Sequence, residues 1–176
     1  MIGMSRPPAV GDIAPDFTLP AWTTDGETTA TLSAQRGKAV VLAFYPADNT
    51  PGCTRQLCSY RDDLDLLADL DVVLWGISTQ DTASHRAFAE KRRLPFPLLA
   101  DTDKSVVKAY GVNGPLMTKR SVFVIDPKGR VAWSHVSTLG LTHQKLDSIA
   151  DVVRRLGTYP AQTPVDEQGR DRNSAT

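Results

Sequence analysis

Two cysteines, Cys53 and Cys58, are the residues in this sequence whose type and spacing suggest chemistry. An unpaired cysteine is usually a small buried hydrophobe, but a cysteine held as a thiolate is a nucleophile that is readily oxidised. A disulfide between the two would close so short a loop that it would constrain the unfolded chain little. We therefore interpret the pair as reactive rather than as a structural bridge.

The residues before Cys53 predict that it lies at the start of a helix. Ala39–Tyr45 is an apolar, partly β-branched run typical of a buried central strand, and Pro46–Asn49 is rich in turn residues. Thr50 suits the N-cap position and Pro51 the first helical position. Cys53 then falls in the first turn, where unpaired backbone N–H groups and the positive end of the helix dipole favour a thiolate.

The same helix predicts where the second cysteine points. Apolar residues continue at helical spacing at Leu57, Tyr60, Leu64 and Leu67. Cys53 precedes Leu57 by four residues and faces inward, whereas Cys58 is rotated from Leu57 by about 100°. Helix geometry separates the two Cα atoms by roughly 8 to 9 Å, but a disulfide needs less than about 7 Å. The two sulfurs can therefore bond only if the helix opens locally.

The rest of the chain predicts the elements that support this helix. Gly11–Lys38 is expected to form an N-terminal hairpin at one edge of the domain. The further elements expected are a strand at Val72–Ser78, a helix from Asp81 to about Arg93, a short helix at about Asp103–Tyr110, strands at Ser121–Ile125 and Arg130–His135 joined by a turn, and a helix at Gln144–Leu156. This order predicts an α/β domain with a mixed central sheet and helices on both faces.

Composition limits the function classes. The chain has 176 residues, of which 41% are hydrophobic and 23% charged, as expected for one well-buried domain. We expect a lead at 1–10, the domain at 11–157 and a polar tail at 158–176. Twenty basic residues balance twenty acidic ones, which argues against nucleic acid or a membrane surface as a partner. Since no apolar stretch has the length of a signal or spanning segment, a cytoplasmic protein is expected.

The pattern Pro46-x-x-x-Thr50-x-x-Cys53, followed by Cys58, resembles the peroxiredoxins, in particular the peroxiredoxin Q or bacterioferritin comigratory protein group. The resemblance extends from about Gly11 to about Leu156. It implies a thioredoxin-like fold with an N-terminal β-hairpin extension, and a thiol peroxidase in which Cys53 reacts with the peroxide. It also implies thioredoxin as the reductant, no metal or bound organic cofactor, and a monomer or weak dimer.

The resemblance assigns further site residues, each of which has a simpler alternative. Thr50 is expected beside the substrate, although it could serve only as a helix cap. Pro46 would shield the thiolate from water or would merely end the strand. Arg120 stands where the family has an active-site arginine, just before a strand, although an arginine there is usually solvated like its neighbour Lys119. Cys58 is either the resolving cysteine or an inert one.

The expected activity is reduction of hydrogen peroxide or a small organic hydroperoxide. Cys53 would become a sulfenic acid, which Cys58 would resolve as an intramolecular disulfide. A thiol–disulfide oxidoreductase is a weaker alternative, because its two cysteines are separated by two residues and here four intervene. A peroxide sensor without turnover and a one-cysteine peroxiredoxin stay open.

Overall fold

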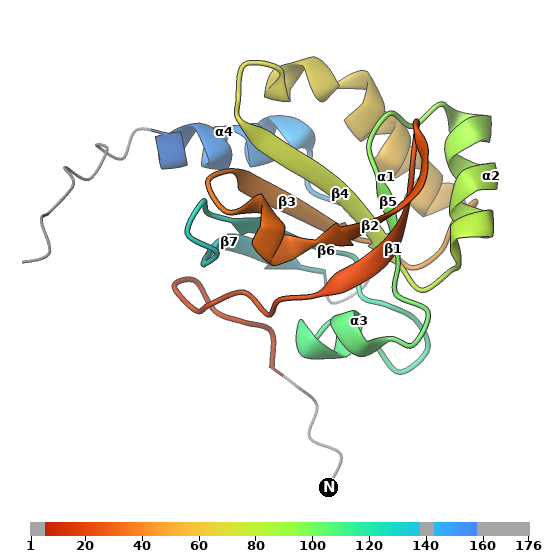
Figure 1. Cartoon of the computed structure of the whole chain (residues 1–176), viewed down its shortest axis with the longest axis horizontal. Helices are drawn as coiled ribbons and strands as arrows, with labels where there is room; N and C mark the ends of the chain where they lie inside the picture. Colours follow the sequence, from red (N-terminus) through yellow and green to blue (C-terminus); the bar gives the residue numbers. More distant parts are fainter. Residues whose placement is uncertain (1–5, 138–142, 158–176) are drawn as a thin grey trace, which may run out of the picture.

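A mixed seven-stranded sheet forms the centre of the part of the protein that the computed structural model describes, residues 6–137 and 143–157 (Figure 1). In order across the sheet, the strands are β2 (Gly26–Thr31), β1 (Thr18–Thr23), β5 (Leu98–Ala100), β4 (Val72–Ser78), β3 (Ala39–Phe44), β6 (Ser121–Ile125) and β7 (Val131–Val136). β4 pairs in parallel with β3 and β5, and the other pairs are antiparallel. The predicted α/β class is confirmed.

Helices cover both faces of the sheet, and Figure 1 shows α3 apart from the other three. The helices are α1 (Pro51–Asp62), α2 (Thr82–Arg92), α3 (Ser105–Ala109) and α4 (Leu146–Gly157), with two short 3-10 turns, η1 (Leu32–Gln35) and η2 (Leu64–Leu67). The central strand β3 is buried on both sides, as predicted. Val41 and Ala43 belong to the core cluster under α1, α2 and α4, whereas Leu42 and Phe44 belong to the cluster under α3.

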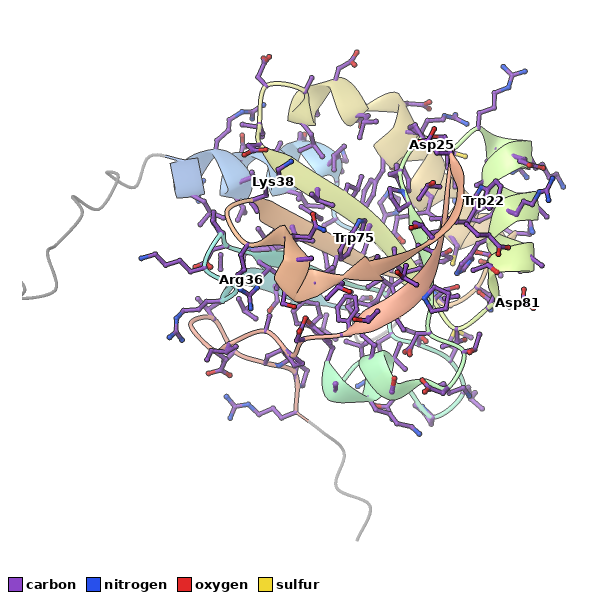
Figure 2. The ribbon with its side chains drawn as sticks, viewed as in Figure 1. Trp22, Asp25, Arg36, Lys38, Trp75 and Asp81 are labelled. Atoms are coloured by element: carbon purple, nitrogen blue, oxygen red, sulfur yellow. The ribbon has the colours of Figure 1, made fainter. Side chains whose placement is uncertain are left out.

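The predicted N-terminal hairpin is present at one edge of the sheet. β1 and β2 pair along their whole length, with Thr18 opposite Thr31 and Thr23 opposite Gly26. The other side of β1 pairs with β5, so the hairpin extends the sheet. Trp22 projects from β1 toward α2 (Figure 2), where the guanidinium of Arg86 lies 5.4 Å from the centre of its ring. This contact anchors the hairpin to α2, which borders the turn at Pro46–Thr50 before Cys53, called the cysteine turn below.

Two elements differ from the prediction. The helix that carries the cysteines ends at Asp62, and Leu64 and Leu67 lie in η2 instead. Two carboxylates, Asp62 and Asp63, oppose the negative end of the helix dipole there, which favours termination. Leu67 still packs in the core cluster beneath α1. Its spacing from Leu57 and Tyr60 therefore indicated a buried position and not a continuation of the helix. The strand β5 was not predicted, because three apolar residues are too few for a periodic signal.

The other strands and helices lie where the sequence predicts them, within a few residues at their ends. Asp81 caps α2 as expected, since its carboxylate accepts a hydrogen bond of 2.9 Å from the backbone N–H of Ser84. The predicted tail at 158–176 lies outside the described residues. None of the described helices has the length and apolar character needed to cross a membrane.

Candidate active site

The turn between β3 and α1 places Cys53 in the first turn of α1, as predicted. The backbone of Thr50 is extended, with φ −76° and ψ 149°, and the helix begins at Pro51. The side chain of Cys53 is fully buried and belongs to the core cluster beneath α1. Its sulfur therefore lies near the N-terminus of α1 and away from bulk water. The helix dipole acts strongly on a group in such surroundings.

Arg120 is brought to Cys53 by the sheet rather than by the sequence. It precedes β6, whose first residue Ser121 lies opposite Phe44 at the end of β3. The guanidinium is almost wholly buried, and its Nη2 donates a hydrogen bond to Cys53 Sγ over 3.4 Å. The simpler alternative of a solvated arginine is therefore wrong. A cation in this place stabilises a thiolate.

Gly52 leaves room for this approach. A Cβ atom at this position would lie 3.0 Å from Nη2 of Arg120. This distance is shorter than an ordinary contact between a carbon and a nitrogen, and Nη2 is the atom that donates to Cys53. A larger residue at position 52 would therefore push the guanidinium away from the sulfur.

Gln56 holds Arg120 and was missed in the sequence. It is fully buried, and its Oε1 accepts a hydrogen bond from Nη1 of Arg120. Its Nε2 donates to the hydroxyl of Tyr60 over 3.4 Å, and that hydroxyl donates to the backbone carbonyl of Gln144 over 2.7 Å. Burial raises the pKa of Tyr60 to about 12, so the phenol keeps the proton that it donates. A glutamine on the inward stripe between Cys53 and Leu57 was the available signal.

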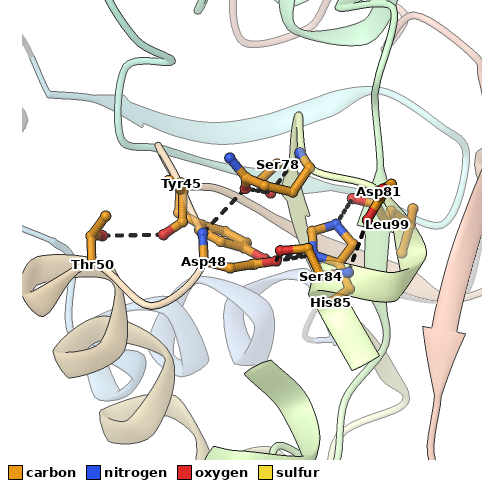
Figure 3. A network of polar contacts seen from close by, with 10 residues as sticks. Tyr45, Asp48, Thr50, Ser78, Asp81, Ser84, His85 and Leu99 are labelled. Atoms are coloured by element: carbon orange, nitrogen blue, oxygen red, sulfur yellow. Dashed lines mark hydrogen bonds and ion pairs between the residues drawn. The ribbon is translucent and has the colours of Figure 1, made fainter. Parts of the chain in front are cut away.

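Thr50 occupies the N-cap position, but its hydroxyl does not cap the helix. The N-cap position is as predicted, and the hydroxyl donates to the carbonyl of Ala47 within the turn over 3.1 Å (Figure 3). A threonine hydroxyl has one donor and two lone pairs. With its proton committed to the turn, the oxygen keeps a lone pair that can accept a further hydrogen bond. Pro46 lies half-buried at the start of the same turn, a place that fits both of its alternatives.

Cys58 is separated from Cys53 by the helix between them. Both cysteines are free, and Cys58 is partly exposed. Because both lie within α1, the regular helix keeps the sulfurs apart, as the spacing predicts. Arg61, on the next turn, donates to the carbonyl of Arg92 at the end of α2. Its hydrogen bond to Asp62, with smaller contributions from Cys58, raises the pKa of Arg61. A guanidinium therefore also lies near the sulfur of Cys58.

His143 borders this site. Its Nε2 lies 3.4 Å from Ser59 Oγ, and its ring stands edge-on to Tyr60 with centroids 6.1 Å apart. Burial lowers the pKa of His143, and the positive charges of Arg120 and Arg55 lower it further. Within residues 6–137 and 143–157, no cluster of three or more His, Cys, Asp or Glu side chains could hold a metal ion.

Comparison with known proteins identifies the family. The model of the AhpC/TSA family matches residues 10–134. This chain belongs to the AhpC/TSA family. The chloroplastic peroxiredoxin Q of Triticum aestivum is 46% identical over 126 residues, which cover 70% of this chain. This chain spans only 57% of that wheat protein.

A bacterial relative matches over nearly its whole length. The protein named putative peroxiredoxin bcp of Coxiella burnetii is 39% identical over 160 residues, which cover 84% of this chain and 97% of the relative. The crystal structure of peroxidoxin BcpB from Mycobacterium tuberculosis is 34% identical, with a TM-score of 0.72 over 88% of this chain and 99% of that one. The resemblance to the peroxiredoxin Q and Bcp group and the thioredoxin-like fold are thus confirmed.

Proposed function

We propose that this protein is a thiol peroxidase that reduces hydrogen peroxide and small organic hydroperoxides. The observation that carries the proposal is the hydrogen bond from the buried guanidinium of Arg120 to the sulfur of Cys53, in the first turn of α1. Helix dipole and guanidinium both stabilise a thiolate there. The names of the relatives in Triticum aestivum and Coxiella burnetii, both peroxiredoxins, support the same activity.

In the first step the Cys53 thiolate attacks one oxygen of the peroxide. A sulfur–oxygen bond forms and the oxygen–oxygen bond breaks, which leaves Cys53 as a sulfenic acid. The leaving oxygen departs with the electron pair and takes a proton to become water or alcohol. Thr50 Oγ1 accepts the hydrogen bond of the peroxide O–H, and Arg120 stabilises the negative charge that grows on the leaving oxygen.

In the second step Cys58 resolves the sulfenic acid. Its thiolate attacks the sulfur of Cys53, a sulfur–sulfur bond forms and the sulfur–oxygen bond breaks, and the hydroxide that leaves takes up a proton to become water. Because both residues lie in α1, the helix must first open between them. An external dithiol, for which we propose thioredoxin, then reduces the disulfide and becomes oxidised itself.

Stopped-flow kinetics with purified thioredoxin and thioredoxin reductase test this proposal. A peroxidase consumes many equivalents of peroxide for each Cys53, whereas a sensor without turnover stops after one stoichiometric oxidation. Turnover that persists in Cys58→Ser with thioredoxin would favour the one-cysteine alternative. A panel of hydrogen peroxide and alkyl hydroperoxides, with thioredoxin, glutaredoxin and small thiols compared as reductants, identifies the preferred pair. The cytoplasmic location and the monomeric or weakly dimeric state stay predictions.

A further inference from the structure

A buried polar network lies behind the cysteine turn, and its centre is Asp48 (Figure 3). This aspartate stands between β3 and α1, and its side chain is only 2% exposed. Its carboxylate accepts hydrogen bonds from the hydroxyl of Tyr45 over 2.6 Å and from that of Ser84 over 2.7 Å. Its Oδ2 also lies 2.7 Å from Nδ1 of His85, a fully buried residue of α2.

Both ring nitrogens of His85 have hydrogen-bond partners. Its Nε2 lies 2.9 Å from the carbonyl oxygen of Leu99. A carbonyl can only accept, so Nε2 bears a hydrogen. Nδ1 meets a carboxylate that already accepts two O–H groups, and two lone pairs cannot meet at 2.7 Å. The contact therefore contains a second proton, which Asp48 Oδ2 and His85 Nδ1 share.

This pair connects the cysteine turn to three other elements. Ser84 and His85 belong to α2, Leu99 belongs to β5, and Tyr45 follows β3. The backbone N–H of Asp48 also donates to Gln80 Oε1 over 3.1 Å. The turn is thus bonded to these elements through Asp48.

The turn has an uncommon backbone conformation. Asn49 is left-handed with φ 62°, a region that asparagine adopts more readily than most residues other than glycine. Thr50 donates to Ala47 within the same turn, so a shift at Asp48 carries Thr50 and the start of α1 with it. A buried polar or charged pair often adds little to global stability compared with apolar residues of equal size. Because Asp48 lies five residues before Cys53, we infer a role in the site instead.

Charge compensation gives the pair a second consequence for Cys53. Tyr45, which donates to Asp48, lies in the same core cluster as Cys53. Burial raises the pKa of Tyr45 far above its ordinary value, and the negative charges of Asp48 and Cys53 raise it further, so the phenol stays a donor. An Asp48 carboxylate without the proton that it shares with His85 would be a buried negative charge in the neighbourhood of Tyr45 and Cys53.

We propose that Asp48 and His85 are positioning residues that form a latch, which holds the Pro46–Thr50 turn and Cys53 in the peroxide-reactive conformation. The latch restrains the same helix start that must open for Cys58 to reach Cys53. Its loss should therefore slow the first step of the reaction without slowing the second. The kinetic part of this inference rests on the proposed peroxidase function.

The test compares Asp48→Ala with Ile125→Ala, which opens a cavity in the other core cluster at the far end of β6. We expect Asp48→Ala to lower the second-order rate with hydrogen peroxide about tenfold or more, since small misplacements of reacting groups carry losses of this size. Disulfide formation after the sulfenic acid should be as fast as in the wild type or faster. Ile125→Ala, although destabilised, should keep both rates.

Amide hydrogen exchange tests the latch without any peroxide. In reduced Asp48→Ala we expect exchange at Ala47–Thr50 and Gly52–Thr54 to accelerate about tenfold or more, as for a locally opened segment, with no such change in Ile125→Ala. If Asp48→Ala does not fold, Asp48→Asn supports the same comparison, because it keeps the shape and removes the charge. Exchange and peroxide rates within about twofold of wild type, or equal losses in both variants, would overturn the latch. A wild-type protein that does not consume peroxide would overturn only the proposed function.

Discussion

Arg120 lies 67 residues after Cys53 in the sequence, yet its Nη2 is 3.4 Å from the sulfur of Cys53. The register of the sheet makes this contact, because the first residue of β6 lies opposite the last residue of β3. The cation reaches the sulfur from the sheet, and the helix dipole reaches it from α1. The two positive influences come from separate elements, so the guanidinium can be removed by mutation while the helix dipole remains.

Replacement of Arg120 should isolate the contribution of the guanidinium. We expect Arg120→Ala to slow the oxidation of Cys53 by hydrogen peroxide about 100-fold or more, the scale of losing one transition-state donor. Arg120→Lys should also be damaging, since an ammonium lacks the planar fork that contacts Cys53 and Gln56 together. Stopped-flow fluorescence measures the rate, with Lys119→Ala as the neighbouring control. An Arg120→Ala rate close to that of the wild type would contradict this role.

Gln56 should act through Arg120 rather than on the peroxide. Gln56→Met keeps the length of the side chain but removes the acceptor for Nη1 and the donor to Tyr60. Without this acceptor the direction of the guanidinium is held less firmly, and we expect a loss of about tenfold in the oxidation rate of Cys53. In a double-mutant cycle, Gln56→Met should add little to Arg120→Ala, because the two act as one unit. Fully additive losses would show that Gln56 acts independently.

Local sequence signals located most of the elements but not the contacts between them. The apolar runs of β3, β4 and β6 and the capping aspartate of α2 are encoded within a few neighbouring residues. The bond between Arg120 and Gln56 spans 64 residues and that between His85 and Asp48 spans 37, so neither leaves a local pattern. Arg120 was found only through the family resemblance. Gln56, Asp48 and His85 are ordinary polar residues until the fold buries them.

The titration of His143 should make stability depend on pH. Burial and the charges of Arg120 and Arg55 lower its pKa in the folded protein below the ordinary value of 6.5. The unfolded chain therefore binds this proton more tightly than the folded protein does. The contribution of His143 to the free energy of unfolding is thus fully present above pH 6.5 and is lost as the pH falls. Urea unfolding of wild type and His143→Asn from about pH 8 to about pH 5 measures the effect. The variant should lose less stability on acidification, whereas parallel curves would contradict the prediction.

The resolving step should require α1 to open. Cys53 and Cys58 lie on different faces of one regular helix, so a disulfide between them breaks the hydrogen bonds of roughly the first two turns. The closed loop is short and its entropic benefit small, so the oxidised form should be readily reduced. After one equivalent of peroxide we expect weaker far-UV circular dichroism and faster amide exchange across Thr50–Arg61. Cys58→Ser should stop at a sulfenic acid that dimedone traps, and its helix should stay protected. Full protection of Thr50–Arg61 in the oxidised wild type would exclude Cys58 as the resolving residue, because the regular helix keeps the sulfurs too far apart to bond.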